Sequence, residues 1–220
     1  MLLKRFGYIF PEALSYLKYG FVFVPAIISV LFLICEYKLS KYLIDNFKKI
    51  SLKEIVPCII IALVGISITC CYSLVEKVSL FNDTYSSLAS LVFNCIYLYV
   101  TALIEEMAWR GFFFQCVITE KKIIISALFV GIVWAAWHIP MWTIRNSMVL
   151  TEIIPLFIWA VVLSIVLGLF YHAFKNILSV ALLHMVFNVC FLAPPKYNTI
   201  VILLSIMVCY AFRRYKKERQ

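Results

Sequence analysis

Glu105, Glu106 and Arg110 are the residues best suited to chemistry, because they lie close together in an otherwise apolar stretch. A charged side chain at bilayer depth costs at least ~2.5 kcal/mol, so such a group needs partners and a purpose. Glu106 and Arg110 are four residues apart, with the acid first, which predicts an ion pair on one helical face. Glu105 is rotated by about 100° from Glu106 and remains the freer carboxylate, suited to general-base chemistry. The alternative is a structural clamp between helices, although a clamp needs one acid rather than two.

Two later apolar segments carry further polar side chains. His138 follows Trp134 by four residues, and His184 and Asn188 are also four residues apart, so each pair shares a helical face. Burying polar groups without partners costs about 2–7 kcal/mol each. We therefore expect these side chains to converge with Glu105. The alternative for His138 alone is a hydrogen-bonded core residue.

Helices inside a membrane must position these residues. Of the 220 residues, 65% are hydrophobic and only 14% charged, which argues against a water-soluble domain. We predict an all-α, polytopic membrane helix bundle with about seven transmembrane helices, forming a single domain over residues 1–220. Pro140 and Pro155 are expected near helix ends. The seven apolar stretches, most of which approach the roughly 20 residues that cross a bilayer, lie at about 19–35, 55–75, 87–118, 123–142, 153–174, 177–192 and 198–212.

Two segments are predicted to lie on the membrane surface rather than across it. Residues 6–17 are interrupted by Pro11 and Glu12 and flanked by basic residues, which favours an N-terminal interfacial helix. The loop at 36–54 interleaves apolar and basic residues, a pattern that suits a helix on an anionic leaflet. No small-residue cleavage site follows the first long apolar run, so a removed signal peptide is not expected.

The net charge of +9 does not indicate a nucleic-acid partner, because the basic residues fall in short loops and in the tail at 213–219. Their distribution follows the positive-inside rule and predicts an integral membrane protein with a cytoplasmic C-terminus. Small size and short loops favour a bacterial plasma membrane. The eight cysteines lie in or beside apolar segments without a Cys-x-x-Cys pair, which disfavours a disulfide framework or a thiolate zinc site.

These motifs resemble the CAAX-protease and bacteriocin-processing family, also called the Abi family, which includes the eukaryotic prenyl-protein endopeptidase. The resemblance covers about residues 87–192, which form the predicted catalytic-motif core. Family members usually carry phenylalanine where this chain has Trp109 and Trp134, and both exchanges keep an aromatic wall. The three motifs lie on separate predicted helices in the family's order: Glu105-Glu106-x-x-x-Arg110, Trp134-x-x-x-His138 and His184-x-x-x-Asn188.

The resemblance implies an intramembrane endopeptidase that hydrolyses a peptide bond of a membrane-associated or lipidated protein or peptide. By that resemblance, Glu105 would be the general base and His138 would help to orient the attacking water. His184 and Asn188 would donate hydrogen bonds to the tetrahedral oxygen. The Glu106 ion pair with the arginine would fix the glutamate helix.

Other kinds of chemistry and function stay open on the sequence. Zinc is an alternative to metal-free catalysis, since Glu105, His138 and His184 form a His₂Glu set with room for water. No His-Glu-x-x-His helix and no separate base support it, so no cofactor is expected. A non-catalytic binding, regulatory or bacteriocin-immunity protein on the same fold is one competing function. A proton-coupled transporter is another, because acids and histidines relay protons in membranes. The expected partners are the lipid bilayer and a membrane protein, peptide or lipidated protein substrate.

Overall fold

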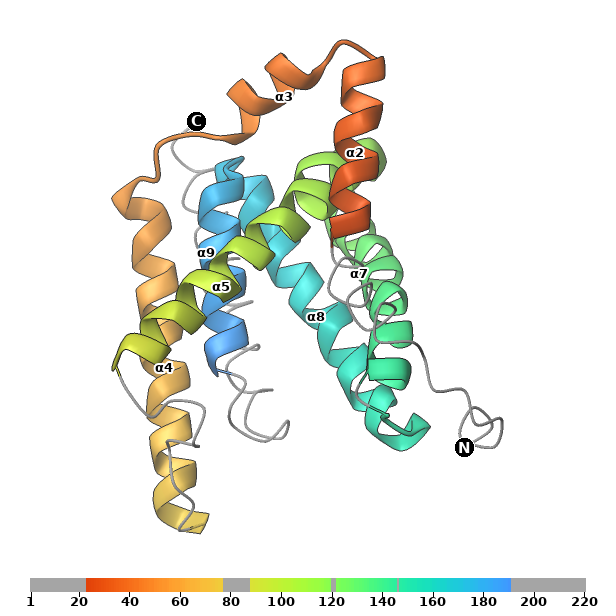
Figure 1. Ribbon diagram of the computed structural model, residues 1–220. Coiled ribbons are helices and arrows are strands. Elements are labelled where there is room, and N and C mark those ends of the chain that lie inside the picture. The colour runs from red at the N-terminus through yellow and green to blue at the C-terminus, as the bar shows by residue number, and fades with distance from the viewer. Residues whose placement is uncertain (1–22, 77–87, 120–121, 146, 191–220) are drawn as a thin grey trace.

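The computed structural model describes residues 23–76, 88–119, 122–145 and 147–190, and every regular element in these ranges is a helix (Figure 1). The all-α prediction is confirmed for this part of the chain. The predicted interfacial helix at 6–17 and the predicted span at 198–212 lie outside the described residues. In chain order the elements are α2 (Val24–Cys35), α3 (Leu39–Asn46), α4 (Leu52–Glu76), α5 (Leu88–Glu106), the π-helix η4 (Met107–Phe113), α6 (Phe114–Val117), α7 (Ile123–Pro140), the π-helix η6 (Met141–Arg145), α8 (Leu150–Phe174) and α9 (Ile177–Cys190).

Two segments in the described ranges are long and apolar enough to cross a bilayer. They are Ile123–Thr143 and Leu150–Phe174, with mean hydropathies of 2.0 and 2.8. α2 and α9 are apolar but have only 12 and 14 residues. By length and composition these two are candidate membrane spans in the described ranges, and the predicted number of seven is not established.

The distribution of side chains is that of a membrane-embedded bundle. Glu106, Arg110 and His184 are buried, with at most 3% of each residue exposed. Large apolar side chains instead point outward along several helices. Soluble monomers rarely expose apolar patches above a few hundred Å², whereas a bilayer solvates such a surface. Examples of these outward apolar residues are Ile27, Leu31, Ile59, Leu63, Ile125 and Phe129.

Small residues hold α7 close against α8, and the two helices run side by side (Figure 1). A Cβ atom on Gly131 would lie 2.8 Å from Cβ of Ser164, and one on Gly168 would lie 2.9 Å from Cβ of Ala127. The Ser164 hydroxyl donates a hydrogen bond of 3.3 Å to the Ala127 carbonyl across this contact. Small residues let membrane helices approach in this way. The contact fixes α7, which carries two of the predicted site residues.

α5 ends at Glu106 and continues directly into the π-helix η4 and then into α6. The sequence predicted one uninterrupted span over 87–118, so this division was not foreseen. π-helical turns carry one more residue per hydrogen-bonded turn than an α-helix and occur frequently at functional sites. α5 also packs against α9, which it crosses obliquely (Figure 1).

The two prolines expected at helix ends behave differently. α7 does end at Pro140, as predicted, and is followed by η6. α8 begins five residues before Pro155, so this proline lies inside the helix and the expected start at 153 was wrong. Glu152 accounts for the earlier start, because its side chain accepts a hydrogen bond of 2.9 Å from the backbone N–H of Val149. Such a carboxylate satisfies one of the free N–H groups at a helix N-terminus.

α3 lies at one end of the bundle, between α2 and α4 (Figure 1). It forms within the 36–54 segment that was predicted to lie on the membrane surface. Its outer face is exposed at Ile44 and carries an ion pair of 3.0 Å between Lys41 and Asp45. Its inner face buries Tyr42 and Asn46 against the bundle.

Candidate active site

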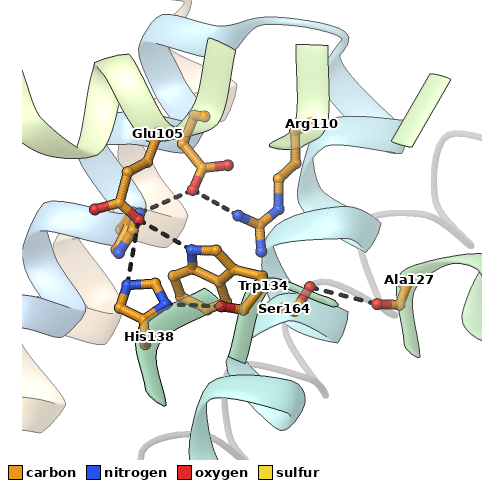
Figure 2. A network of polar contacts seen from close by, with 8 residues as sticks. Glu105, Arg110, Ala127, Trp134, His138 and Ser164 are labelled. Atoms are coloured by element: carbon orange, nitrogen blue, oxygen red, sulfur yellow. Dashed lines mark hydrogen bonds and ion pairs between the residues drawn. The ribbon is translucent and has the colours of Figure 1, made fainter. Parts of the chain in front are cut away.

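Glu105 and His138 form the partly exposed half of the site, with 15% of each side chain accessible. The indole N–H of Trp134 donates a hydrogen bond of 3.0 Å to Oε2 of Glu105. Nε2 of His138 lies 3.8 Å from the same oxygen, beyond hydrogen-bonding distance. Figure 2 shows the carboxylate facing both rings.

The tautomer of His138 follows from its other nitrogen. Nδ1 lies 2.7 Å from the backbone carbonyl oxygen of Trp134, one helical turn earlier. A carbonyl oxygen only accepts hydrogen bonds, so Nδ1 must carry the proton. In neutral His138, Nε2 is therefore an unprotonated acceptor that faces Glu105. A water molecule placed between them has an acceptor on each side.

Glu106, Arg110 and His184 form the buried half of the site. Oε1 of Glu106 accepts a hydrogen bond of 2.8 Å from Nη1 of Arg110, and Nδ1 of His184 also lies 2.8 Å from it. Both side chains of the ion pair are fully buried. Oε2 of Glu106 and Nε and Nη2 of Arg110 have no hydrogen-bond partner among the described residues. The buried Glu106–Arg110 ion pair therefore depends on the contacts that it does make, because an uncompensated buried charge is strongly destabilising.

The indole ring of Trp134 separates the two halves. Its centroid lies 5.1 Å from the His138 ring and 5.4 Å from the His184 ring, both in edge-to-face geometry. The guanidinium carbon of Arg110 lies 4.8 Å from the indole centroid, a cation–π contact. In Figure 2 the ring lies between Glu105 and Arg110. One side chain thus contacts groups of both halves.

The structure sorts the sequence-predicted residues differently from the expected single cluster. Glu105 lies beside His138, whereas His184 contacts Glu106. Asn188 lies one turn after His184 on α9, is half-buried, and makes no hydrogen bond to another described residue. Trp109 is buried and packs edge-to-face against the rings of Trp137 and Phe113, at 6.5 and 6.2 Å. Trp109 therefore packs among aromatic rings, and its predicted place in an aromatic wall stays a prediction.

Sequence reasoning missed one functional contact, the hydrogen bond from Trp134 to Glu105. It described Trp134 only as part of an aromatic wall, in a position where the resembled family has phenylalanine. The available signal was the indole N–H, which is a donor without acceptor capacity and usually finds a partner when buried. Among the groups predicted at the same depth, the two glutamates were the strongest acceptors.

The zinc alternative requires Glu105, His138 and His184 to act together. The structure divides them, since the first two lie in the exposed half and His184 contacts Glu106. In the described ranges no group of three His, Cys, Asp or Glu side chains is arranged to hold a metal ion. A His₂Glu zinc site is therefore not preformed among the described residues.

The fold and the site define a class of protein: a membrane helix bundle with a carboxylate–histidine pair contributed by separate helices. Residues 86–190, from α5 to α9, match the family described as type II CAAX prenyl endopeptidase Rce1-like. CAAX prenyl protease 2 of Methanococcus maripaludis is 29% identical over 108 residues, which cover 46% of this chain and 39% of that relative. The chain thus spans well under half of that relative's length. Residues 86–190 are thus similar to a family of proteases, and this match together with the candidate membrane spans indicates an integral membrane protein. The family resemblance predicted from the motifs is confirmed.

Proposed function

We propose that this protein is an intramembrane endopeptidase that hydrolyses a peptide bond of a membrane-associated or lipidated protein or peptide. The observation that carries the proposal is the 3.8 Å separation between Oε2 of Glu105 and Nε2 of His138. Both atoms belong to the partly exposed half of the site, so substrate and water have access to them. Binding at the bilayer and a cytoplasmic C-terminus in a bacterial plasma membrane are part of the same proposal.

In the proposed reaction, a water molecule donates one hydrogen bond to Glu105 and the other to Nε2 of His138. Glu105 takes the first proton as the water oxygen attacks the carbonyl carbon of the scissile peptide bond. The C=O bond becomes a C–O⁻ bond in a tetrahedral intermediate. Glu105 then returns the proton to the leaving nitrogen as the C–N bond breaks. The C–O⁻ bond becomes C=O again, the Glu105 carboxylate is regenerated, and the second proton of the water leaves with the new carboxyl group, which releases it to solvent.

Trp134 supports this assignment of the base. Its N–H occupies one acceptor site of Oε2 of Glu105 and fixes the carboxylate toward α7, where His138 also lies. A carboxylate oxygen has a second acceptor site, which remains for water. Orientation of this kind lowers the barrier because less freedom is lost in the reaction.

His184 and Asn188 are the proposed donors to the tetrahedral oxygen, and the geometry places a condition on His184. If Nδ1–H donates to Glu106, then Nε2 donates only when the ring is an imidazolium. If Glu106 is instead protonated and donates to Nδ1, Nε2–H is free to donate. Oε1 of Glu106 already accepts a hydrogen bond from Arg110, which favours the first arrangement, in which the same oxygen also accepts from His184.

The proposal is tested with purified protein in liposomes and a fluorogenic farnesylated peptide ending in a CAAX-type sequence. Glu105→Gln keeps the size and the hydrogen-bond acceptor of the side chain but removes its basicity. We expect hydrolysis to fall by at least about 10²-fold, the lower end of general-base contributions. Glu152→Gln is the matched control, since Glu152 caps the N-terminus of α8 and belongs to none of the three motifs.

Three results separate the competing functions. Hydrolysis that persists in Glu105→Gln rejects the catalytic assignment. A cellular phenotype that survives both Glu105→Gln and His138→Ala favours binding without cleavage. A proton flux into liposomes that His184→Ala abolishes favours a transporter.

A further inference from the structure

Tyr42 contacts the end of the glutamate helix although it lies outside the family-matched segment. Its hydroxyl donates a hydrogen bond of 2.7 Å to the carbonyl oxygen of Met107, the first residue of η4 and the neighbour of Glu106. Only 7% of Tyr42 is exposed. Burial, with smaller effects from Tyr171 and Glu106, raises the pKa of the Tyr42 phenol, so it remains a proton donor throughout the physiological range.

The fit between Tyr42 and η4 explains the glycine that follows Arg110. A Cβ atom on Gly111 would lie 2.2 Å from the Tyr42 hydroxyl and 2.3 Å from Cδ1 of Ile177. Distances this short do not occur between non-bonded atoms, so any side chain here would displace its neighbours. Gly111 thus allows the tyrosine to reach the π-helix from α3.

α3 is itself tied to the bundle, so Tyr42 is not a mobile contact. The side-chain amide of Asn46 donates a hydrogen bond of 2.8 Å to the backbone carbonyl of Tyr42. Oδ1 of Asn46 accepts hydrogen bonds from Gln115, at 3.2 Å, and from the hydroxyl of Tyr171. The donors belong to α6 and α8. Tyr42 is therefore held in place, through Asn46, by α6 and α8.

The register of η4 decides how the chain continues after the two glutamates. If this segment adopted α-helical hydrogen bonding, the residues that follow it would rotate by about 100° relative to α5. Phe114 and Gln115 would then leave their contacts with Tyr171. A hydrogen bond from outside the helix to the first π-helical carbonyl favours the observed register.

We propose that Tyr42 is a positioning residue, which fixes the π-helical register of η4 through the Met107 carbonyl and thereby holds in place the end of α5 that carries Glu105 and Glu106. The proposal rests on the proposed peptidase function. It assigns a role in the reaction to α3, which the family-matched segment does not include.

The first test compares Tyr42→Phe with Tyr99→Phe in the liposome assay with the farnesylated peptide. Both variants lose one hydroxyl that donates to a backbone carbonyl of another element, that of Leu178 at 3.3 Å for Tyr99. We expect kcat to fall about 5-fold for Tyr42→Phe with KM unchanged, from the loss of one hydrogen bond. Tyr99→Phe should keep the wild-type kcat. An unchanged kcat in Tyr42→Phe, or an equal loss in both variants, overturns the proposal.

The second test does not depend on hydrolysis, so it distinguishes failure of this inference from failure of the peptidase proposal. Amide hydrogen exchange of residues 107–113 is measured in the same two variants. Faster exchange in Tyr42→Phe alone supports the proposal, and equal exchange in wild type and Tyr42→Phe overturns it. The result stands even if the wild-type protein does not cleave the peptide.

A double-mutant cycle tests the contact itself. Gly111→Ala should lower the Tm because its methyl group meets the Tyr42 hydroxyl. In the Tyr42→Phe background the same methyl group meets less obstruction, so the further loss of Tm should be smaller. Strictly additive losses would show that the two residues are not in contact and would overturn the proposal.

Discussion

The indole N–H of Trp134 lies 3.0 Å from Oε2 of Glu105 and donates a hydrogen bond to it. This contact joins α7 to the C-terminal end of α5, two helices that meet at the site from separate parts of the sequence. It also restricts the carboxylate to one orientation, in which the same oxygen faces His138. The geometry of the site therefore depends on how α5 and α7 are placed as well as on the residue types.

Trp134→Phe removes this donor while keeping an aromatic ring. Hydrogen bonds to charged groups contribute about 1.5–3 kcal/mol, so we expect kcat for the farnesylated peptide to fall roughly 10- to 100-fold. Trp109→Phe is the matched exchange, because the Trp109 indole makes no hydrogen bond to a described residue. The decrease in kcat should be smaller for this variant. Equal effects of the two variants on kcat would contradict a special role for the Trp134 N–H.

Neutralising Glu106 should lower the stability of the protein, whereas neutralising Glu105 should change it little. Glu106→Gln leaves Arg110 buried without its anion and should lower the free energy of unfolding by about 3–5 kcal/mol. Glu105→Gln should leave stability close to that of wild type, because this side chain is partly exposed. Thermal unfolding in detergent micelles measures both effects. A stability loss that is larger for Glu105→Gln would reverse the assignment of the two acids.

His184 and Asn188 should differ in what they contribute. Loss of an oxyanion donor costs about 2.7–4 kcal/mol in other hydrolases, so Asn188→Ala should lower kcat about 10²–10³-fold while retaining the wild-type Tm. His184→Ala should lower both kcat and Tm, because it also removes a contact to buried Glu106. A wild-type kcat in Asn188→Ala would remove this residue from the proposed oxyanion site.

Chelation should leave the hydrolytic activity intact. Glu105 and His138 lie in a different half of the site from His184, so the three do not present a ready zinc site. Activity is measured after treatment with a chelator, together with the metal content of the purified protein. One zinc per chain, with activity lost on chelation and restored by zinc, would establish the His₂Glu alternative instead.

Much of the local structure could be predicted from spacing, and much of the tertiary arrangement could not. Helical periodicity placed Glu106 and Arg110 on one face, and their atoms lie 2.8 Å apart. The π-helix after Glu106 was not predictable, because its register depends on Tyr42, which is distant in sequence. The partner of His184 was also hidden, since periodicity gives the face of a residue on its own helix but not which neighbour it meets.

The small-residue contact between α7 and α8 has a mechanical consequence for the reaction. Gly131 and Gly168 let these helices pack closely at two points, so α7 and α8 form one packed pair. His138 belongs to this pair, whereas Glu105 belongs to the helix that packs on α9. The separation between Glu105 and His138 therefore depends on how the two helix pairs are placed. A change in that placement would alter this separation and, with it, the proposed activation of water.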